Sequence, residues 1–359
     1  MQSGRDRPSV EFTFRWFGPH DPVPLAHLAQ VPGVRTVVTS LADVPAGTAW
    51  SDEAIAERRA LCAAAGLTWT VAESVAVHES IKLGADAHAH PHARDDAIEA
   101  FALTLERLGR AGVEIVCYNF MPVFDWMRTE FARPLADGST TMAHVQHDLD
   151  AIDLTLGLPQ LAAWPKGYTA HELDELLERY AGVDERRLLE HYRHFIAAVA
   201  PVAERAGVRL AIHPDDPPWP IFGLPRIVND EASLADILAA SSSPAHGLTF
   251  CTGALGARGD TDVVALAERF ASRSHFVHAR NVRRTGERDF YEADHTPEAG
   301  DVNLVEVLRA LLDGGFSGPI RPDHGRMIWG ETGIPGYGLH DRALGLMYLR
   351  GAYDTLRRA

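Results

Sequence analysis

The sequence predicts an α/β fold, a (β/α)8 TIM barrel with a long insertion after its fourth strand. Three observations predict it: eight short β-rich runs recur along the 359 residues, most are apolar at nearly every position, and most are separated by amphipathic helical patterns. Strands that are apolar throughout are typical of a parallel sheet covered on both faces. The competing doubly wound sheet would favour a glycine-rich first turn, which Trp16-Phe17-Gly18-Pro19 does not provide.

The eight expected strands follow one another along the chain without an internal repeat. Barrels of this class often exceed about 200 residues in one domain. We therefore expect a single barrel domain over residues 1–359. The strands are expected at residues 12–17, 35–41, 68–74, 114–120, 209–213, 247–252, 275–282 and 319–323.

The helical stretches between these strands carry start and stop signals. Ser51 can cap a helix that has Asp52 and Glu53 in its first turn and that ends at Gly66. A second long helix ends at a glycine in the same way and carries Pro201 as an expected kink. The further helices are expected at residues 95–111, 185–206, 261–270, 304–312 and 340–357.

Residues 121–183 are too long for an ordinary connection and form the expected insertion. The dipeptide Asp137-Gly138 predicts a small hairpin over residues 134–144. Thr169 and Glu172 have the spacing of a capping box, which predicts a short helix after it. Long insertions at the catalytic end of a barrel are often lids. The segment is therefore read either as a lid or as a packing excursion or oligomer contact.

Composition and charge exclude several classes of partner and compartment. The chain has 49 acidic and 34 basic residues, a formal charge of −15, which argues against nucleic-acid or anionic-membrane partners. It has no run of 18 apolar residues and no visible secretory signal. Three cysteines in so long a chain do not make a disulfide framework, which favours a reducing compartment, the cytoplasm. We expect a homo-oligomer, taken as a dimer, that acts on a small molecule.

Four consecutive barrel strands from the fifth onward are expected to end in side chains that bind metals. Active sites of barrels lie at the C-terminal ends of the strands. There the sequence places an imidazole, a thiol, a second imidazole and a carboxylate, from His213, Cys251, His278 and Asp323. These four make a mixed nitrogen, sulfur and oxygen site for a divalent metal. Each one alone would more often be a core residue, and their coincidence at adjacent strand ends carries the prediction.

Short motifs along the whole chain resemble the mannonate dehydratase family, in the order of that family. They are RWFGP (15–19), ESV (73–75), VHE (77–79), CYNFMPV (117–123), DW (125–126), AIHPDDPP (211–218), GLPRI (223–227), CTG (251–253), RPDHGR (321–326), PGYG (335–338) and DRALG (341–345). The resemblance implies a barrel, a divalent metal (Mn²⁺ or Fe²⁺), and loss of water from D-mannonate. The product would be 2-dehydro-3-deoxy-D-gluconate, in the breakdown of hexuronates such as glucuronate.

The resemblance also assigns residues. The metal ligands of the family fall on the four residues chosen from the strand ends, and its acid/base pair falls on His324 and Tyr337. His324 directly follows a ligand, so strand alternation would point it away from Asp323 unless the strand has already ended. The carboxylate and hydroxyls of the substrate need further partners near the strand ends, and the candidates are Arg15, His78, Asn119, Arg280 and Asn281.

Two rival functions remain open at this point. The first is a metal-dependent sugar isomerase or epimerase on a barrel like that of xylose isomerase. Such sites use carboxylates and histidines, so Cys251 and the Asp323-His324 pair favour the lyase. The second rival is a metal-stabilised barrel that serves as a scaffold or binding protein. The intact pair of His324 and Tyr337 weighs against it.

Overall fold

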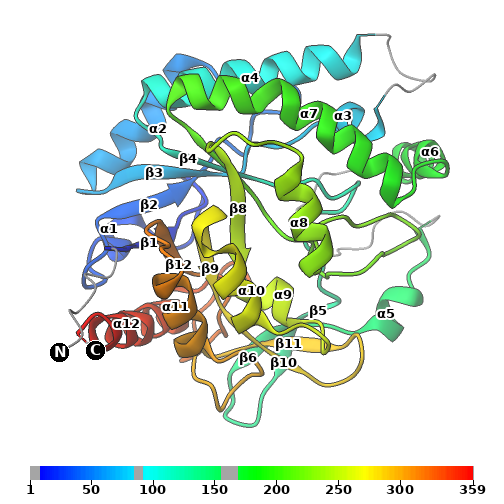
Figure 1. Cartoon of the computed structure of the whole chain (residues 1–359). Coiled ribbons are helices and arrows are strands. Elements are labelled where there is room, and N and C mark those ends of the chain that lie inside the picture. The colour runs from blue at the N-terminus through cyan, green and yellow to red at the C-terminus, as the bar shows by residue number, and fades with distance from the viewer. Residues whose placement is uncertain (1–8, 85–91, 155–168, 359) are drawn as a thin grey trace.

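The computed structural model describes residues 9–84, 92–154 and 169–358. Eight parallel strands close a barrel, and helices surround it (Figure 1). The predicted fold class is therefore confirmed, and every expected barrel strand is present with ends that differ by at most three residues. In barrel order the strands are β1 (Glu11–Arg15), β12 (Pro319–Pro322), β9 (Ser274–Ala279), β8 (His246–Cys251), β7 (Arg209–Ile212), β4 (Ile115–Tyr118), β3 (Thr68–Glu73) and β2 (Thr36–Thr39).

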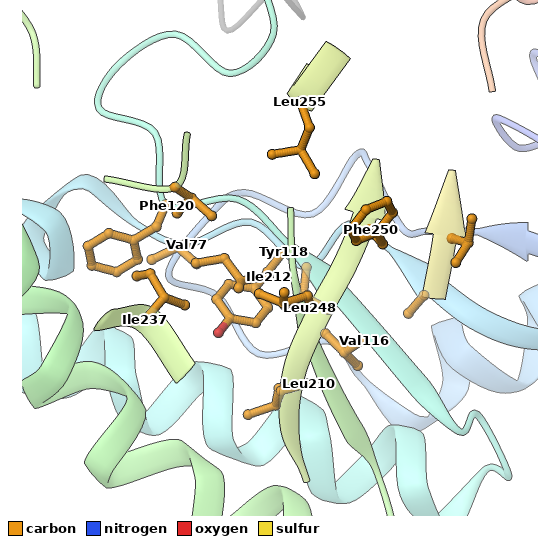
Figure 2. Packing of buried hydrophobic residues seen from close by; sticks show 14 of the residues in the cluster. Val77, Val116, Tyr118, Phe120, Leu210, Ile212, Ile237, Leu248, Phe250 and Leu255 are labelled. Atoms are coloured by element: carbon orange, nitrogen blue, oxygen red, sulfur yellow. The ribbon is translucent and has the colours of Figure 1, made fainter. Parts of the chain in front are cut away.

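Apolar residues on the two faces of these strands enter two different cores. Val38, Ile115 and Cys117 belong to a small cluster that excludes their sequence neighbours, as the alternation of side chains along a strand requires for the barrel interior. The neighbours Val116 and Tyr118 belong to the large cluster beneath the helices. Figure 2 shows side chains of β4, β7 and β8 gathered in that outer layer. Burial on both faces explains why the strands are apolar throughout.

The predicted long helices form, and their ends use the expected signals. The Ser51 hydroxyl accepts a hydrogen bond from the Ala54 amide at the start of α2. Helix α7 contains Pro201 and ends at Gly207, which has a left-handed φ of 70° that glycine adopts without strain. The long helices are α2 (Asp52–Ala64), α4 (Ala93–Arg110), α7 (Glu185–Ala206), α10 (Val263–Phe270), α11 (Leu304–Asp313) and α12 (Leu339–Leu356).

Shorter helices complete the connections. Helix α8 was not anticipated, although Asp230 and Ser233 form a capping box at its start. Among the described residues, no helix is both long and apolar enough to cross a membrane. The shorter helices are α1 (Leu25–Leu28), α3 (Glu79–Leu83), α5 (Gln146–Asp150), α6 (Ala170–Tyr180), α8 (Glu231–Ala239), α9 (Thr252–Gly256) and the 3-10 turn η2 (Ala271–Arg273).

The insertion after β4 contributes to a second, four-stranded sheet in the order β10-β11-β6-β5. Its hairpin of β5 (Glu130–Pro134) and β6 (Thr140–His144) confirms the predicted turn, although β5 begins four residues earlier than expected. The capping box at Thr169 is present and opens α6. Residues 155–168 of the insertion lie outside the described residues.

One expected strand is in fact two. The segment of residues 275–282 was predicted to be a single barrel strand, but β9 ends at Ala279. After Arg280 the chain leaves the barrel as β10 (Asn281–Arg284), which pairs antiparallel with β11 (Phe290–Ala293). Strand β11 then pairs with β6 of the insertion, so two excursions from the barrel share one sheet (Figure 1). Only one residue separates β9 from β10, and no glycine or proline marks the break, so the sequence did not reveal this change of sheet.

Candidate active site

The four strand ends with metal-binding side chains lie next to one another in the barrel wall. His213 directly follows β7, and Cys251 is the last residue of β8. His278 lies in β9, and Asp323 directly follows β12. The barrel order β12-β9-β8-β7 makes these strands consecutive neighbours, and Cys251 pairs with His278 in register. Strand order therefore brings the four side chains to one part of the rim.

The ligand atoms of these residues converge. His213 Nε2 lies 3.1 Å from His278 Nδ1, and Asp323 Oδ2 lies 3.7 Å from the same nitrogen. Cys251 Sγ is 4.0 Å from Asp323 Oδ2. One ligand atom each from His213, Cys251 and His278 lies within 4.8 Å of the others. Two imidazole nitrogens, a sulfur and a carboxylate oxygen fit a divalent transition metal.

A second candidate group shares His278 but uses Glu73 and Cys117. Burial raises the pKa of the Cys117 thiol well above its ordinary value, so this sulfur stays protonated. The thiolate is the form that binds metals, which makes this second group the weaker one. Cys117 belongs to the apolar interior of the barrel, as its place in the sequence predicted.

Charges around Cys251 favour the thiolate. Burial raises the pKa of this thiol, but the positive charges of Arg280 and His213 outweigh burial and hold the pKa well below its usual range. Burial lowers the pKa of His213, but Cys251 and Asp323 oppose burial and raise that pKa to about 9. The two ligand atoms lie within 4.8 Å of each other, so each charge offsets the cost of burying the other. A divalent metal held here would be bound by a sulfur whose surroundings already favour the thiolate.

Asp323 is also held in its charged form. Burial raises the pKa of its carboxyl, while Arg321, His324 and His278 lower it, and the net pKa lies well below the usual range. Arg321 Nη1 lies 2.6 Å from Asp323 Oδ1, and Arg280 Nε lies 2.9 Å from Asp323 Oδ2. Two arginines thus compensate the cost of burying this ligand in its ionised form.

The two residues of the expected acid/base pair touch each other. His324 Nε2 and the Tyr337 hydroxyl oxygen are 2.8 Å apart, within a normal hydrogen bond. Strand β12 ends at Pro322, so His324 is free of strand alternation and its Nε2 lies 3.8 Å from Asp323 Oδ1. Burial and the charge of Asp323 raise the pKa of Tyr337 above its ordinary value, so its hydroxyl is protonated at neutral pH.

A narrow cavity at the barrel mouth joins the metal-ligand candidates to this pair. Of the five expected substrate partners, Arg15 and Asn119 line it. Arg15 also donates a hydrogen bond to the Glu73 carbonyl oxygen. The lining residues are Arg15, Glu73, Ser74, Asn119, Met121, Trp126, His213, Asp216, His278, Arg321, Asp323, His324 and Tyr337.

The other three expected partners lie elsewhere. His78 caps α3, where its Nδ1 accepts from the Ser80 amide, and it faces a different hollow beside α6. Arg280 lies beneath the cavity and pairs with buried carboxylates. The Asn281 side-chain amide donates to the carbonyl oxygen of Thr296 and its oxygen accepts from the amide of Val302. Arg280 directly follows β9, but its guanidinium is taken up by these carboxylates, and the Asn281 side chain is taken up by backbone groups, so neither side chain lines the cavity.

Comparison with known proteins identifies the family. The sequence matches the family model of D-mannonate dehydratase (UxuA) over residues 10–359. The chain belongs to this family. It is 45% identical over 349 residues to mannonate dehydratase 2 of Halalkalibacterium halodurans, a match that covers 97% of this chain and 99% of that protein.

Solved structures agree with this assignment to the D-mannonate dehydratase family. The crystal structure of mannonate dehydratase from Streptococcus suis serotype 2 has a TM-score of 0.88 and 40% identity, and covers 98% of this chain and 94% of that chain. A xylose isomerase-like TIM barrel protein from Mycobacterium smegmatis has a TM-score of 0.55 at 17% identity, over 99% of this chain and 100% of that one. At that identity the likeness concerns the fold alone.

Sequence reasoning missed several buried or half-buried charged residues of this D-mannonate dehydratase family member. Glu73 ends β3, so the strand-end rule alone would have found it. Its carboxylate accepts from Arg321 at 2.8 Å and lies 3.4 Å from His278 Nε2. Arg128 and Glu292 lie in the two segments that leave the barrel and form the small sheet, and no local sequence pattern there indicates a site residue. Only the pairing of distant segments brings them to the mouth.

Proposed function

We propose that this protein removes water from D-mannonate to give 2-dehydro-3-deoxy-D-gluconate, as a step of hexuronate breakdown. The observation that carries the proposal is the hydrogen-bonded pair of His324 and Tyr337 in one cavity with three of the four candidate metal ligands, while the fourth, Cys251, has its sulfur 4.0 Å from Asp323 Oδ2. This arrangement occurs in a chain that matches the D-mannonate dehydratase family along nearly its whole length.

The reaction needs one base and one acid. The base takes the proton from C2, and the electron pair of that C–H bond forms a C2–C3 double bond as the C3–O bond breaks. The acid gives its proton to the departing hydroxide, which leaves as water. The resulting enol becomes the 2-keto acid when C3 takes up a proton. His324 and Tyr337 are adjacent and share one hydrogen bond, so the pair can supply both proton transfers.

His213, Cys251, His278 and Asp323 would hold a single divalent metal, proposed as Mn²⁺ or Fe²⁺. A sulfur ligand disfavours Mg²⁺, which prefers oxygen. When bound, the metal supplies a positive charge that stabilises the negative charge developing next to the substrate carboxylate. Arg15 and Asn119 line the same cavity and are the proposed partners of the substrate carboxylate and hydroxyls.

Two further features are proposed with the function. Three cysteines with free thiols, all buried, support a reducing cytoplasmic location. The homodimer expected from the sequence stays a prediction, which sedimentation velocity would test. The reading of residues 121–183 as a lid also stays a prediction. Its described residues, 121–154 and 169–183, include the hairpin of β5 and β6, which pairs with β11 in the small sheet.

An assay with D-mannonate separates the lyase from its rivals. The purified protein, loaded with Mn²⁺, is incubated with D-mannonate, D-mannose or D-xylose, and 2-keto acid and ketose are measured separately. We expect 2-keto acid from D-mannonate only, and its loss when a chelator removes the metal. Formation of a ketose from an aldose would show that the protein is a sugar isomerase and not a lyase. Metal binding without turnover of any substrate would favour the scaffold.

A further inference from the structure

Glu292 of the small sheet contacts the acid/base pair from the side opposite Tyr337. Its carboxylate is fully buried, and its Oε1 lies 3.1 Å from His324 Nδ1. The other ring nitrogen of His324 lies 2.8 Å from the Tyr337 hydroxyl oxygen. The three side chains therefore form a chain of hydrogen bonds in the order Glu292, His324, Tyr337. Neither the motifs nor the metal-ligand argument singled out the first of them.

Two arginines keep Glu292 ionised. Arg280 Nη1 donates to both of its carboxylate oxygens, at 2.9 and 2.7 Å, and Arg128 donates to Oε1 from Nε at 3.0 Å and from Nη2 at 2.6 Å. Burial raises the pKa of Glu292, but the charges of Arg280 and Arg128 outweigh burial, and the pKa lies well below its usual range. An ionised carboxylate can accept hydrogen bonds but cannot donate one.

The ionised carboxylate of Glu292 determines which ring nitrogen of His324 donates to it. In the neutral imidazole one ring nitrogen donates and the other accepts. Because Glu292 can only accept, Nδ1 carries a proton and donates it, and Nε2 is the ring nitrogen that faces the Tyr337 hydroxyl. The geometry points to Glu292 as a positioning residue that holds the proton of His324 on Nδ1 and leaves Nε2 as the proton acceptor of the pair. This inference rests on the proposed function of the pair.

The inference also gives the small sheet a role in the reaction. Strand β11 carries Glu292, and the hydroxyl of Thr141 on neighbouring β6 donates to the Glu292 carbonyl oxygen at 2.6 Å. Asp216, after β7, also accepts from Arg128 and Arg280, so both arginines have a second carboxylate partner. Removal of the charge of Glu292 alone therefore leaves each arginine paired.

The test replaces the charge of Glu292 and keeps its shape. In Glu292→Gln the amide can offer an N–H to Nδ1, which favours the proton on Nε2, the wrong nitrogen. We expect kcat for D-mannonate to fall by about 10- to 1,000-fold, in the range of general acid–base contributions. KM and bound metal per chain should stay within twofold. Glu292→Asp, which keeps the charge, should recover part of the lost kcat. Thr141→Val removes a side chain that touches the same strand but not the carboxylate, and it should keep kcat within about twofold.

A second background separates positioning from structure. If Glu292 acts through His324, then adding Glu292→Gln to His324→Asn should lower kcat no further, because residues that act as one unit are not additive. A full additive loss in the double variant would overturn the inference, as would a wild-type kcat in Glu292→Gln. Loss of metal together with kcat in Glu292→Gln would also overturn it. Turnover of D-mannonate by the wild-type protein is measured in parallel. If the wild-type protein does not turn over D-mannonate, the proposed function itself is wrong.

Discussion

Cys251 is the one sulfur in a proposed metal-binding group whose other members offer nitrogen and oxygen atoms. Its thiolate is favoured by Arg280 and His213 before any metal arrives, since these charges lower its pKa against the opposing effect of burial. A serine at this position has the same approximate shape, but its hydroxyl stays protonated and is a much weaker ligand.

We expect Cys251→Ser to lower bound metal and activity together. Metal per chain, measured by inductively coupled plasma mass spectrometry after dialysis against a fixed Mn²⁺ concentration, checks this. Cys62→Ser is the matched control, because Cys62 is buried in the core at α2, away from the cavity. Normal metal content and full turnover in Cys251→Ser would remove this residue from the ligand set.

The acid/base pair makes a different prediction, because neither residue is assigned to the metal. His324→Asn and Tyr337→Phe should keep the fold and the bound metal. Each should lose turnover by about 10²- to 10⁴-fold, the usual contribution of a positioned acid or base. Circular dichroism, metal content and kcat for D-mannonate are measured on each variant. A loss below tenfold in both would show that the pair does not carry the proton transfers.

The sequence predicted the position of a residue correctly where a barrel strand ends at the point that the sequence pattern indicates. His213, Cys251 and Asp323 sit at or just past true strand ends, so the strand-end rule placed them at the rim. Arg280 and Asn281 also follow β9 closely but do not line the cavity, because Arg280 is held by buried carboxylates and Asn281 begins β10. The partners of Arg280 are carboxylates on segments far away in the sequence, which no local pattern reveals.

At the scale of elements, the small sheet is joined to the barrel by a buried ion cluster. Arg128, just before β5, is fully buried and bonds Asp216 after β7 and Glu292 on β11. A buried pair adds little net stability compared with apolar packing, but the loss of one partner leaves a charge uncompensated.

We therefore expect Arg128→Met to lower the free energy of unfolding by about 3–5 kcal/mol. Arg133→Met is the matched control. Arg133 pairs with Glu130 on the same strand β5, but both side chains are partly exposed, so its loss should cost less than about 1 kcal/mol. Guanidinium chloride unfolding of the chelated proteins measures both. Equal costs for the two variants would contradict the structural role of the cluster.

Among the elements, the sequence predicted those features whose sequence signals come from residues close together in the chain. The hairpin at Asp137-Gly138 and the capping box at Thr169 involve residues that are close in sequence, and both form. The pairing of Phe290 with His144 joins two segments that are 146 residues apart in the sequence, so the shared sheet was not foreseeable from either segment.

At the scale of the whole molecule, three buried histidines make stability depend on pH. Burial lowers the pKa of His144, His246 and His275 from 6.5 to about 4 each. In the unfolded chain each takes up a proton near pH 6.5, whereas in the folded protein each stays neutral until about pH 4. The unfolded state therefore binds more protons in this window, and stability falls as the pH drops from 6.5 towards 4.

At pH 5 each of these histidines should cost about 1–2 kcal/mol of stability relative to pH 7.5. Urea unfolding of the chelated protein at the two pH values checks the direction. His246→Gln should reduce the difference, because glutamine takes up no proton, while replacement of the exposed His171 by Gln should leave it unchanged. A stability that is equal or higher at pH 5 would contradict the burial of these rings in neutral form.

The central claim is that the cavity at the barrel mouth expels water from D-mannonate, and the fate of its atoms tests this most directly. The Mn²⁺-loaded protein is incubated with D-mannonate in D₂O, the metal is then chelated, and the product is read by nuclear magnetic resonance and mass spectrometry. We predict a 2-keto acid that has lost the C3 oxygen and carries one solvent deuteron at C3. A product that keeps the C3 hydroxyl, or unchanged D-mannonate, would contradict the account.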